Sequence, residues 1–489
     1  MTESKVKSVA LEMPVADSKL KEGKFKDLLR YLGPGIVVAS ASIGNGEIFF
    51  ASREGALFGF SLLWTFVVCA FMKGCVVYTG SKYATLTGVH PTVRWGQIIP
   101  GPKNWMAIFL GIVAAIAIPS SISGFIKVLG QWSCWTFGID TTYTVLCGTL
   151  WSIVAFLFVF FDYEKIEKVS TVIILILVVF ALLAVFGSRP DWIAMAQGLI
   201  PTVPSQYPDW VQEKAPQALS SPILLEIVSA VGILGGGCQD YLGYIGTVSE
   251  KKWGMYGNEN ISEIQQTLKN LSGKEEVPLP SDEATVSDAK GWLKAVKIDN
   301  ISSFTAVWLV GTIFMVLGSV VLGTNGMQIV PSNDQIIQNQ ANFFAVISPA
   351  LVSLYKLAIF CAFFGGIIAL STQVYPATFR ACFSPTFPAI QKEENKFKTR
   401  IGVAIFCVFG GILLAWTNIT YTFLLQIATV IGSVFGIGLV GLLMLWTEKK
   451  SLPKEYRLKP LWFTLTLLSS VTMVSLGVVA FLQLFGIIK

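Results

Sequence analysis

The sequence predicts an all-α membrane protein in which two groups of five transmembrane helices form an inverted repeat and an eleventh helix follows. Of the 489 residues, 53% are hydrophobic and only 13% are charged, which excludes a protein made of soluble domains. Eleven windows are long and apolar enough to cross a bilayer, which takes about 20 residues each. The first and the sixth of these windows are interrupted by glycine and polar residues.

These windows, numbered here as spans 1 to 11, define the expected organisation of the chain. A polar N-terminal tail (1–30) precedes the first five-helix repeat (31–187), and an outer loop (188–220) leads into the second repeat (221–446). The second repeat carries a charged insertion at 249–300, and residues 447–489 form an inner loop and span 11. The spans are expected at 31–54, 56–81, 105–131, 142–162, 167–187, 221–247, 302–323, 350–376, 401–416, 420–446 and 461–487.

The distribution of charge predicts how the chain lies in the membrane. With a cytoplasmic N-terminus, most of the 36 Lys and Arg residues fall on cytoplasmic segments. The outer segments keep only Arg53, Arg189, Lys214 and Lys489. This positive-inside pattern predicts a multi-pass protein of the plasma or inner membrane with its C-terminus outside. The net charge of +6 therefore requires no nucleic-acid partner, and the oligomeric state is left open, with a monomer plausible.

Span 1 is interrupted by Gly44, Asn45, Gly46 and Glu47. Because glycine costs a helix interior about 1 kcal/mol relative to alanine, this sequence predicts unwound backbone. Unwound backbone at membrane depth is tolerated only where it is buried in protein or lines a cavity, so we expect a binding site here. A carboxylate at this depth is a functional candidate by default, although Glu47 could instead pair with a neighbouring helix.

Span 6 carries the second interruption, where glycines at 235–237 precede Cys238, Gln239 and Asp240. In the inverted repeat the two breaks occupy corresponding positions, and such paired interruptions indicate the central site of a transporter. Together with Asn45 and Glu47, the Gln239 and Asp240 side chains and the carbonyls freed near Gly44 and Gly235 would offer oxygen ligands suited to Mg²⁺, Ca²⁺ or Mn²⁺. For Asp240, a role as a helix cap is an equal alternative.

Several short motifs stand out along the core. They are Gly33-Pro34-Gly35, the ten residues from Gly55 to Trp64, a turn that ends at Gly88, Tyr163-Glu164-Lys165 and Ser371-Thr372-Gln373. These motifs give the chain, most closely in the early part of its core, a resemblance to the Nramp family of divalent-metal transporters. It implies the LeuT-type fold with helices 1 and 6 unwound, in agreement with the repeat. It also implies transport of a divalent cation by alternating access, with the metal as substrate and no cofactor.

Several positions depart from the family pattern. Gly44 stands where the family has its metal-binding Asp, and Glu47 stands at the position of the liganding Asn. The family's Ala-x-x-Met in span 6 corresponds to Ile233 and Gly236, so the thioether that favours soft metals is missing. The span-6 histidines are missing too, since the only histidine is His90. Magnesium-transporting relatives share these losses, so we expect Mg²⁺ or Mn²⁺ as cargo without the usual proton coupling.

Three further polar residues lie within spans. Gln426 in span 10 corresponds loosely to a family glutamine that contacts the substrate, although an interhelical hydrogen bond is the commoner role. Glu226 in span 6 would line an outer vestibule or make an interfacial hydrogen bond. Lys73 in span 2 must pair, snorkel or face a cavity. Its position in the window is about 12 Å from the depth of Glu47, so we expect no direct pairing between them.

Two functions are compatible with these residues. The first is transport of a divalent cation, with Asn45, Glu47 and Asp240 as metal ligands. The second is transport of a small organic solute, such as an amino acid or a carboxylate, which Lys73 and the glycine-rich breaks would favour. The sequence contains no phosphate-binding loop and no paired nucleophile and base, so we do not expect an enzyme. In the stretch 325–348 we expect a short surface helix.

Overall fold

The computed structural model describes residues 11–488, apart from 34, 36–44, 162–163, 332–334 and 346. The regular elements of this part are all helical. The elements that form the spans are η2 (Asn45–Phe50), α4 (Ala51–Phe58), α5 (Leu63–Thr87), α7 (Trp105–Phe137), α8 (Thr144–Leu157), α9 (Glu164–Ser188), α12 (Ile223–Ile233), α13 (Cys238–Thr247), α15 (Glu283–Leu317), α17 (Leu351–Ala369), α18 (Tyr375–Phe383), α19 (Glu393–Ala415), α20 (Tyr421–Ile427), α21 (Ile437–Ser451) and α22 (Pro460–Leu484). The shorter helices are α1 (Ser18–Glu22), α2 (Phe25–Leu28), α6 (Pro91–Ile98), α10 (Trp192–Gln197), α11 (Asp209–Lys214), α14 (Ile261–Lys269) and α16 (Ile336–Ala345).

Each expected span contains a helix at the predicted place. Among the described residues, 8 helices are long and apolar enough to cross a membrane, and they correspond to spans 2 to 4 and 7 to 11. Span 6 consists of two shorter pieces, α12 and α13, as its interruption predicts, and span 5 corresponds to α9. Span 1 is described from Asn45 onward as η2 and α4. The all-helical membrane fold is therefore confirmed, while the total of eleven crossings stays a prediction.

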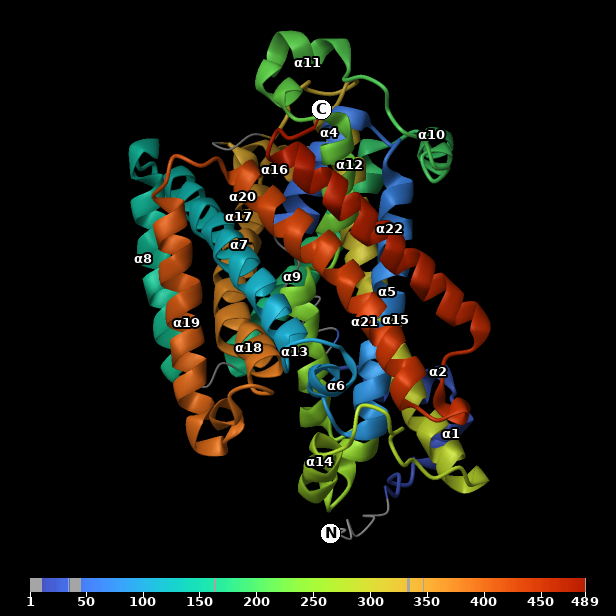
Figure 1. Ribbon diagram of the computed structural model, residues 1–489. Coiled ribbons are helices and arrows are strands. Elements are labelled where there is room, and N and C mark those ends of the chain that lie inside the picture. Colours follow the sequence, from blue (N-terminus) through green and yellow to red (C-terminus); the bar gives the residue numbers. More distant parts are fainter. Residues whose placement is uncertain are drawn as a thin grey trace, which may run out of the picture.

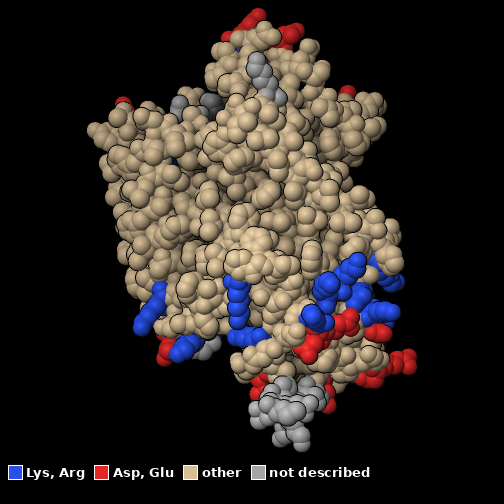
Figure 2. Space-filling view, in the orientation of Figure 1, with Lys and Arg blue, Asp and Glu red and all other residues tan. Residues whose placement is uncertain are grey.

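The helices form one bundle around a continuous apolar core (Figure 1). Within it α5 packs along α15, α7 packs against both α8 and α19, and α21 packs along α22. The first described helix, α1, and the end of α22 lie at opposite ends of the bundle, as an odd number of crossings requires. Lys and Arg gather at the lower end of the face in Figure 2, called the basic end below, and a wide uncharged belt lies above it. The other end, which carries α11, is called the α11 end.

Four π-helical segments interrupt the described parts of the spans. They are η2 in span 1, η8 (Gly318–Leu322) in span 7, η9 (Leu370–Val374) in span 8 and η11 (Ala428–Gly436) in span 10. Each extra residue in a π-turn misaligns the carbonyls of the preceding turn, which is why such segments cluster at functional sites. Here η2 and η11 border the break in span 6, as described below.

The insertion at 249–300 is more ordered than a solvated loop. Its last third belongs to α15, which begins at Glu283, after Asp282 accepts a hydrogen bond from the Thr285 N–H (2.9 Å) as its N-cap. The insertion shares a small apolar core with the N-terminal stretch and the basic end of α5, built from residues such as Leu11, Leu86 and Ile264. The helix of span 7 therefore begins about five turns before the expected start of the span at residue 302.

The helix expected within 325–348 is present as α16, but it is not a surface helix. Phe343 and Phe344 are buried, and Phe344 stacks on Tyr355 of α17 with ring centroids 4.9 Å apart. The polar sequence around α16 led to the surface prediction. Its apolar side chains instead close the bundle beside span 1.

Two glycines allow α4 to cross the α15–η8 helix in close contact. A Cβ on Gly55 would lie 2.0 Å from the Met315 carbonyl oxygen, and a Cβ on Gly318 would lie 2.2 Å from that of Ser52. Because both obstacles are backbone atoms, neither clash can be relieved by turning a side chain.

We expect the substitution Gly55→Ala to lower the free energy of unfolding by roughly 1–3 kcal/mol or more, because the two helices must separate. Gly402→Ala in α19 is the matched control, since nothing lies within 4 Å of its Cβ position. Thermal unfolding of both variants in detergent tests the contact. Equal melting temperatures for the two variants would contradict it.

Candidate transport site

The break in span 6 lies between α12 and α13, as the glycines predict. Leu234 has extended backbone (φ −62°, ψ 120°), and Gly235 and Gly236 have positive φ angles of 75° and 77°. A Cβ on Gly236 would also lie 2.4 Å from a carboxylate oxygen of Asp240. Four residues of backbone thus leave the helix at the centre of the bundle. Their N–H and C=O groups need partners elsewhere.

Span 1 is described only from Asn45 at this point, so Gly44 lies outside the described residues. From Asn45 to Phe50 the chain forms the π-helical segment η2. The prediction that residues 45–47 are unwound is therefore wrong for this part of the break. A π-helical segment accommodates Gly46 while it keeps most backbone hydrogen bonds.

Span 1 meets the break in span 6 through Glu47. Its Oε1 atom accepts a hydrogen bond of 2.8 Å from the backbone N–H of Gly235, and its side chain is fully buried. One carboxylate from the first half of the protein thus binds a freed N–H group of the second half. The convergence that the inverted repeat predicts is present at this contact.

Lys73 of α5 binds the carbonyls that the break releases. Its fully buried ammonium group donates hydrogen bonds to the carbonyl oxygens of Gly232 (2.7 Å), Leu234 (2.6 Å) and Gly236 (2.7 Å). An ammonium group has three N–H donors, so all of them are used. Lys73 also interacts electrostatically with Glu47 and Asp240. A positive charge of the chain itself therefore occupies the carbonyl cluster at the break.

The expected separation in depth between Lys73 and Glu47 was wrong. Helix α5 begins at Leu63 rather than at 56, and α4 continues to Phe58 rather than ending at 54. Each residue therefore lies about ten residues, or roughly 15 Å, from the α11 end of its helix. Both side chains reach the same peptide units at 234–236.

Asp240 and Gln239 lie at the start of α13. The Asp240 carboxylate accepts hydrogen bonds from the Gly237 N–H (2.7 Å) and from Gln239 Nε2 (2.9 Å). This is the capping arrangement that was the alternative to metal binding, because it satisfies a free N–H at the helix start. The structure thus brings Asp240 and Gln239 to the break with their polar atoms engaged within span 6.

The other candidate residues are placed differently. Asn45 begins η2 and Ile233 ends α12; the structure describes the backbone of both. Gln426 does not reach the break, because its Nε2 contacts Ser221 Oγ (3.4 Å) just before α12. Instead η11 borders the break, since a Cβ on Gly237 would lie 2.7 Å from Ser433 Oγ.

Gln340 of α16 is a site residue that the sequence analysis missed. Its Nε2 donates to the Ile48 carbonyl (2.8 Å) in η2 and to Ser52 Oγ (2.7 Å), and its Oε1 accepts from the Tyr355 hydroxyl (3.0 Å). It therefore supports the π-turn that carries Glu47. Its position in a polar stretch between spans gave no periodicity that could identify it.

A buried charge cluster links spans 1 and 6 on the side of the α11 end. Arg53 of α4 donates to Glu226 of α12 (3.0 Å) and to the Pro331 carbonyl (3.3 Å). Glu54 is also buried and interacts electrostatically with both charged partners. Glu226 therefore neither lines an open vestibule nor makes an interfacial hydrogen bond; it is half of a buried ion pair.

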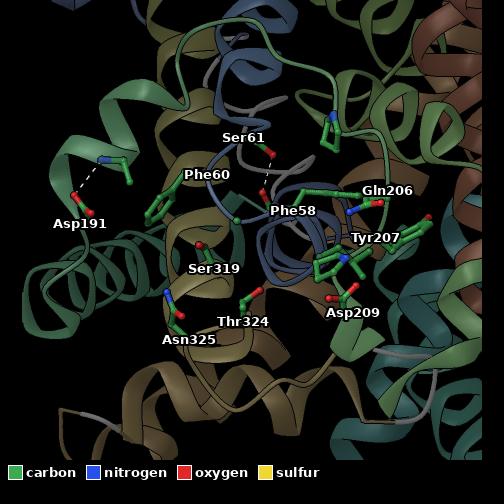
Figure 3. Close-up of a pocket in the computed structure, with 15 residues that line it drawn as sticks. Phe58, Phe60, Ser61, Asp191, Gln206, Tyr207, Asp209, Ser319, Thr324 and Asn325 are labelled. Carbon is green, nitrogen blue, oxygen red and sulfur yellow. Dashed lines mark hydrogen bonds between the residues drawn. The ribbon is translucent and has the colours of Figure 1, made fainter. Parts of the chain in front are cut away.

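A pocket of about 510 Å³ lies at the α11 end, next to this charge cluster (Figure 3). Asp191 and Asp209 line it, and no Lys or Arg does. Tyr207, which also lines the pocket, interacts electrostatically with Glu54 and Glu226. The pocket thus has an acidic lining and borders the buried cluster of spans 1 and 6.

At the basic end, span 1 is attached to span 7. The Asp299 carboxylate of α15 accepts hydrogen bonds from the Gly33 N–H (2.8 Å), the Gly35 N–H (2.9 Å) and the Tyr244 hydroxyl (2.8 Å). Since Tyr244 belongs to α13, this contact joins both broken spans to α15. The break is therefore enclosed by polar contacts on both sides.

One protein-family model matches most of the chain. The family model described as Nramp, natural resistance-associated macrophage protein-like, matches residues 35–483. The chain belongs to the Nramp family. The match includes the interrupted regions of spans 1 and 6 and reaches into span 11. The similarity to the family therefore extends well beyond the early motifs on which the resemblance rested.

Individual Nramp relatives are distant. A divalent metal cation transporter MntH of Caldanaerobacter subterraneus subsp. tengcongensis is 25% identical over 189 residues, which cover 37% of this chain and 43% of the relative. A protein of the same name from Listeria welshimeri is 22% identical over 309 residues, which cover 62% of this chain and 57% of the relative. The chain thus spans about half the length of the curated relatives it matches.

A solved structure shows the same fold. The manganese transporter of Eremococcus coleocola, in complex with an aromatic bis-isothiourea substituted compound, superimposes with a TM-score of 0.65 at 15% sequence identity. The superposition covers 99% of this chain and 92% of the transporter. The predicted LeuT-type architecture of the Nramp family is therefore confirmed.

The buried charge cluster yields a stability prediction. Arg53→Met leaves the buried Glu226 carboxylate without its cation, so we expect a loss of roughly 3–5 kcal/mol in the free energy of unfolding. The double variant Arg53→Met/Glu226→Gln should recover much of this loss, because one uncompensated charge is removed.

The measurement is unfolding in detergent at neutral pH, with the exposed Lys214→Met as a control that removes one positive charge from the same end. An Arg53→Met variant as stable as this control would show that the cluster contributes no net stability.

Proposed function

We propose that this Nramp-family chain is a transporter that moves a divalent cation, Mg²⁺ or Mn²⁺, by alternating access around the site where the two breaks meet. The observation that carries the proposal is the Glu47 carboxylate of span 1 bound to the Gly235 N–H of the span 6 break (2.8 Å). A fully buried carboxylate at the junction of two broken spans supplies the negative charge that a divalent cation requires.

The contacts on either side of the break supply the parts of a gating mechanism. In this proposal the Arg53–Glu226 pair closes the outer side, and Asp299 with its three donors closes the inner side. Opening one side while the other stays closed lets the cargo reach the break from that side only. The acidic pocket at the α11 end would concentrate cations before they enter.

The proposal does not include proton coupling through histidine. His90, the only histidine of the sequence, lies before α6, where Nε2 donates to the Leu242 carbonyl (3.1 Å). Burial lowers the pKa of His90 to about 4, so its imidazole is uncharged at neutral pH. A divalent cation can instead be driven inward by the membrane potential, which supplies about 2.3 kcal/mol per charge per 100 mV.

Lys73 imposes a condition on this mechanism. A divalent ion about 6 Å from an ammonium group is repelled by roughly 5 kcal/mol at an effective dielectric constant of 20. Within the described residues, no group of three or more His, Cys, Asp or Glu side chains could hold a metal ion unaided. The cation would therefore need the carbonyls that Lys73 occupies, and Lys73 must leave them when the cargo binds.

The position of Lys73 also favours a second candidate function, the transport of an organic solute with a carboxylate group. In that case the ammonium group remains at the break and binds the anionic end of the solute, while Glu47 binds a cationic end. An amino acid has both groups. The first candidate requires Lys73 to leave the break and the second requires it to stay, so a variant without Lys73 distinguishes between them.

The first test concerns Glu47. Glu47→Gln keeps an oxygen that can accept from the Gly235 N–H and removes the negative charge. We expect Mn²⁺ uptake into proteoliposomes to fall roughly 30-fold or more, since the loss of a buried charged partner costs at least about 2 kcal/mol. Glu263→Gln on the exposed face of α14 serves as the control. Uptake by Glu47→Gln at the rate of the control would remove Glu47 from the site.

The second test concerns Lys73. If the cargo is a divalent cation, Lys73→Met should tighten Mn²⁺ binding by about tenfold or more, because the repulsion disappears and three carbonyls become available. Lys356→Met is the control, because Lys356 lies over the Trp135 ring at 4.0 Å, away from the break. Isothermal calorimetry measures both variants. Weaker Mn²⁺ binding by Lys73→Met, together with lost binding of an amino acid, would favour the second candidate.

A further inference from the structure

A groove of about 930 Å³ opens on the side of the bundle at the basic end. It lies between α5, α15 and the connection from α21 to α22, and it is separate from the break in span 6. None of the residues at the break lines it. The groove therefore belongs to a different part of the molecule and needs its own explanation.

The wall of the groove toward the middle of the bundle is apolar. Val67 and Phe71 of α5 are 42% and 44% exposed, and Trp462 of α22 is 43% exposed. The rings of Phe71 and Trp462 lie 6.5 Å apart and form one side of the groove. This wall continues into the uncharged belt of the bundle, which a bilayer covers. A ligand can thus enter from the membrane.

The rim of the groove toward the basic end is positively charged. Lys290, Lys297, Lys454 and Lys459 line it, are exposed, and form no ion pair with any described residue. The other two basic residues of the groove are already paired, Lys82 with Glu448 (2.8 Å) and Arg457 with Glu276 (2.7 Å). Among the described residues that line the groove, Glu455 is the only acidic one. The rim therefore carries uncompensated positive charge.

Two hydrogen-bond donors in the groove lack partners. The Asn300 Nδ2 and Trp308 Nε1 atoms are buried, and neither has a hydrogen-bond acceptor in the described part of the chain. Asn300 is only 5% exposed. A buried donor without an acceptor costs about 1–3 kcal/mol, so two such donors in one groove indicate a ligand with oxygen acceptors.

We propose that this groove binds an anionic phospholipid of the leaflet at the basic end. The phosphate and headgroup lie among the four lysines, ester and phosphate oxygens accept from Asn300 and Trp308, and the acyl chains follow the apolar wall. A soluble phosphate compound matches the lysines but leaves the wall uncovered. Basic pockets between transmembrane helices are the known setting for such headgroups. This inference does not depend on the nature of the cargo.

The test compares phosphatidylglycerol with phosphatidylcholine on the purified full-length protein, by native mass spectrometry and by thermal unfolding. We expect phosphatidylglycerol to remain bound and to raise the melting temperature, with little effect of phosphatidylcholine or inorganic phosphate. The double variant Lys297→Gln/Lys459→Gln should bind phosphatidylglycerol roughly 10- to 30-fold more weakly, since each lysine near an anionic headgroup contributes about a fivefold factor.

Two further variants test the position of the lysines and the role of the unpartnered Asn300 donor. Lys274→Gln/Lys398→Gln removes two exposed lysines outside the groove and should bind like the unmodified protein. Asn300→Leu should lose part of the stabilisation by phosphatidylglycerol without becoming less stable in its absence, because it removes an unpartnered donor. Equal binding of both lipids, stabilisation by inorganic phosphate alone, or equal losses in both lysine double variants would overturn the proposal.

Discussion

The ammonium group of Lys73, held by three carbonyls of the broken span 6, is the interaction on which the candidate site depends. The break leaves the carbonyls of Gly232, Leu234 and Gly236 without helical partners at a depth where water is excluded. Lys73 satisfies them, and its own charge is in turn offset by Glu47 and Asp240. Removing any one member would leave a buried charge or a buried carbonyl uncompensated.

This arrangement also connects the site to the ends of the bundle. The segment η2, which carries Glu47, continues directly into α4, which carries Arg53. The carboxylate at the break and the cation that pairs with Glu226 therefore lie on one continuous helix. The opposite side of span 1 is held by Asp299. In the proposed mechanism, a movement of span 1 would act on the break and on both closing contacts together.

Much of the fold and part of the candidate site could be predicted from the sequence, for physical reasons that differ between elements. The glycines at 235–237 predicted the break in span 6, because no helix centre tolerates three of them, and the inverted repeat predicted that the two breaks meet. The role of Lys73 could not be predicted, since hydropathy windows misplaced the ends of α4 and α5 by four to seven residues. Gln340 was missed because a tertiary contact, and no sequence pattern, buries α16. The groove with Asn300 requires three segments that are distant in sequence.

The proposed function requires that the cargo binds where Glu47 meets the break. It also requires that the Lys73 ammonium group leaves the carbonyls of span 6, so that the cargo can bind them. Anomalous X-ray diffraction from crystals grown with Mn²⁺ tests this most directly. The account predicts a single anomalous peak within bonding distance of the Glu47 carboxylate, with the Lys73 ammonium group moved away from the Leu234 carbonyl. A peak elsewhere in the bundle, or an unmoved Lys73 with no peak beside Glu47, would contradict it.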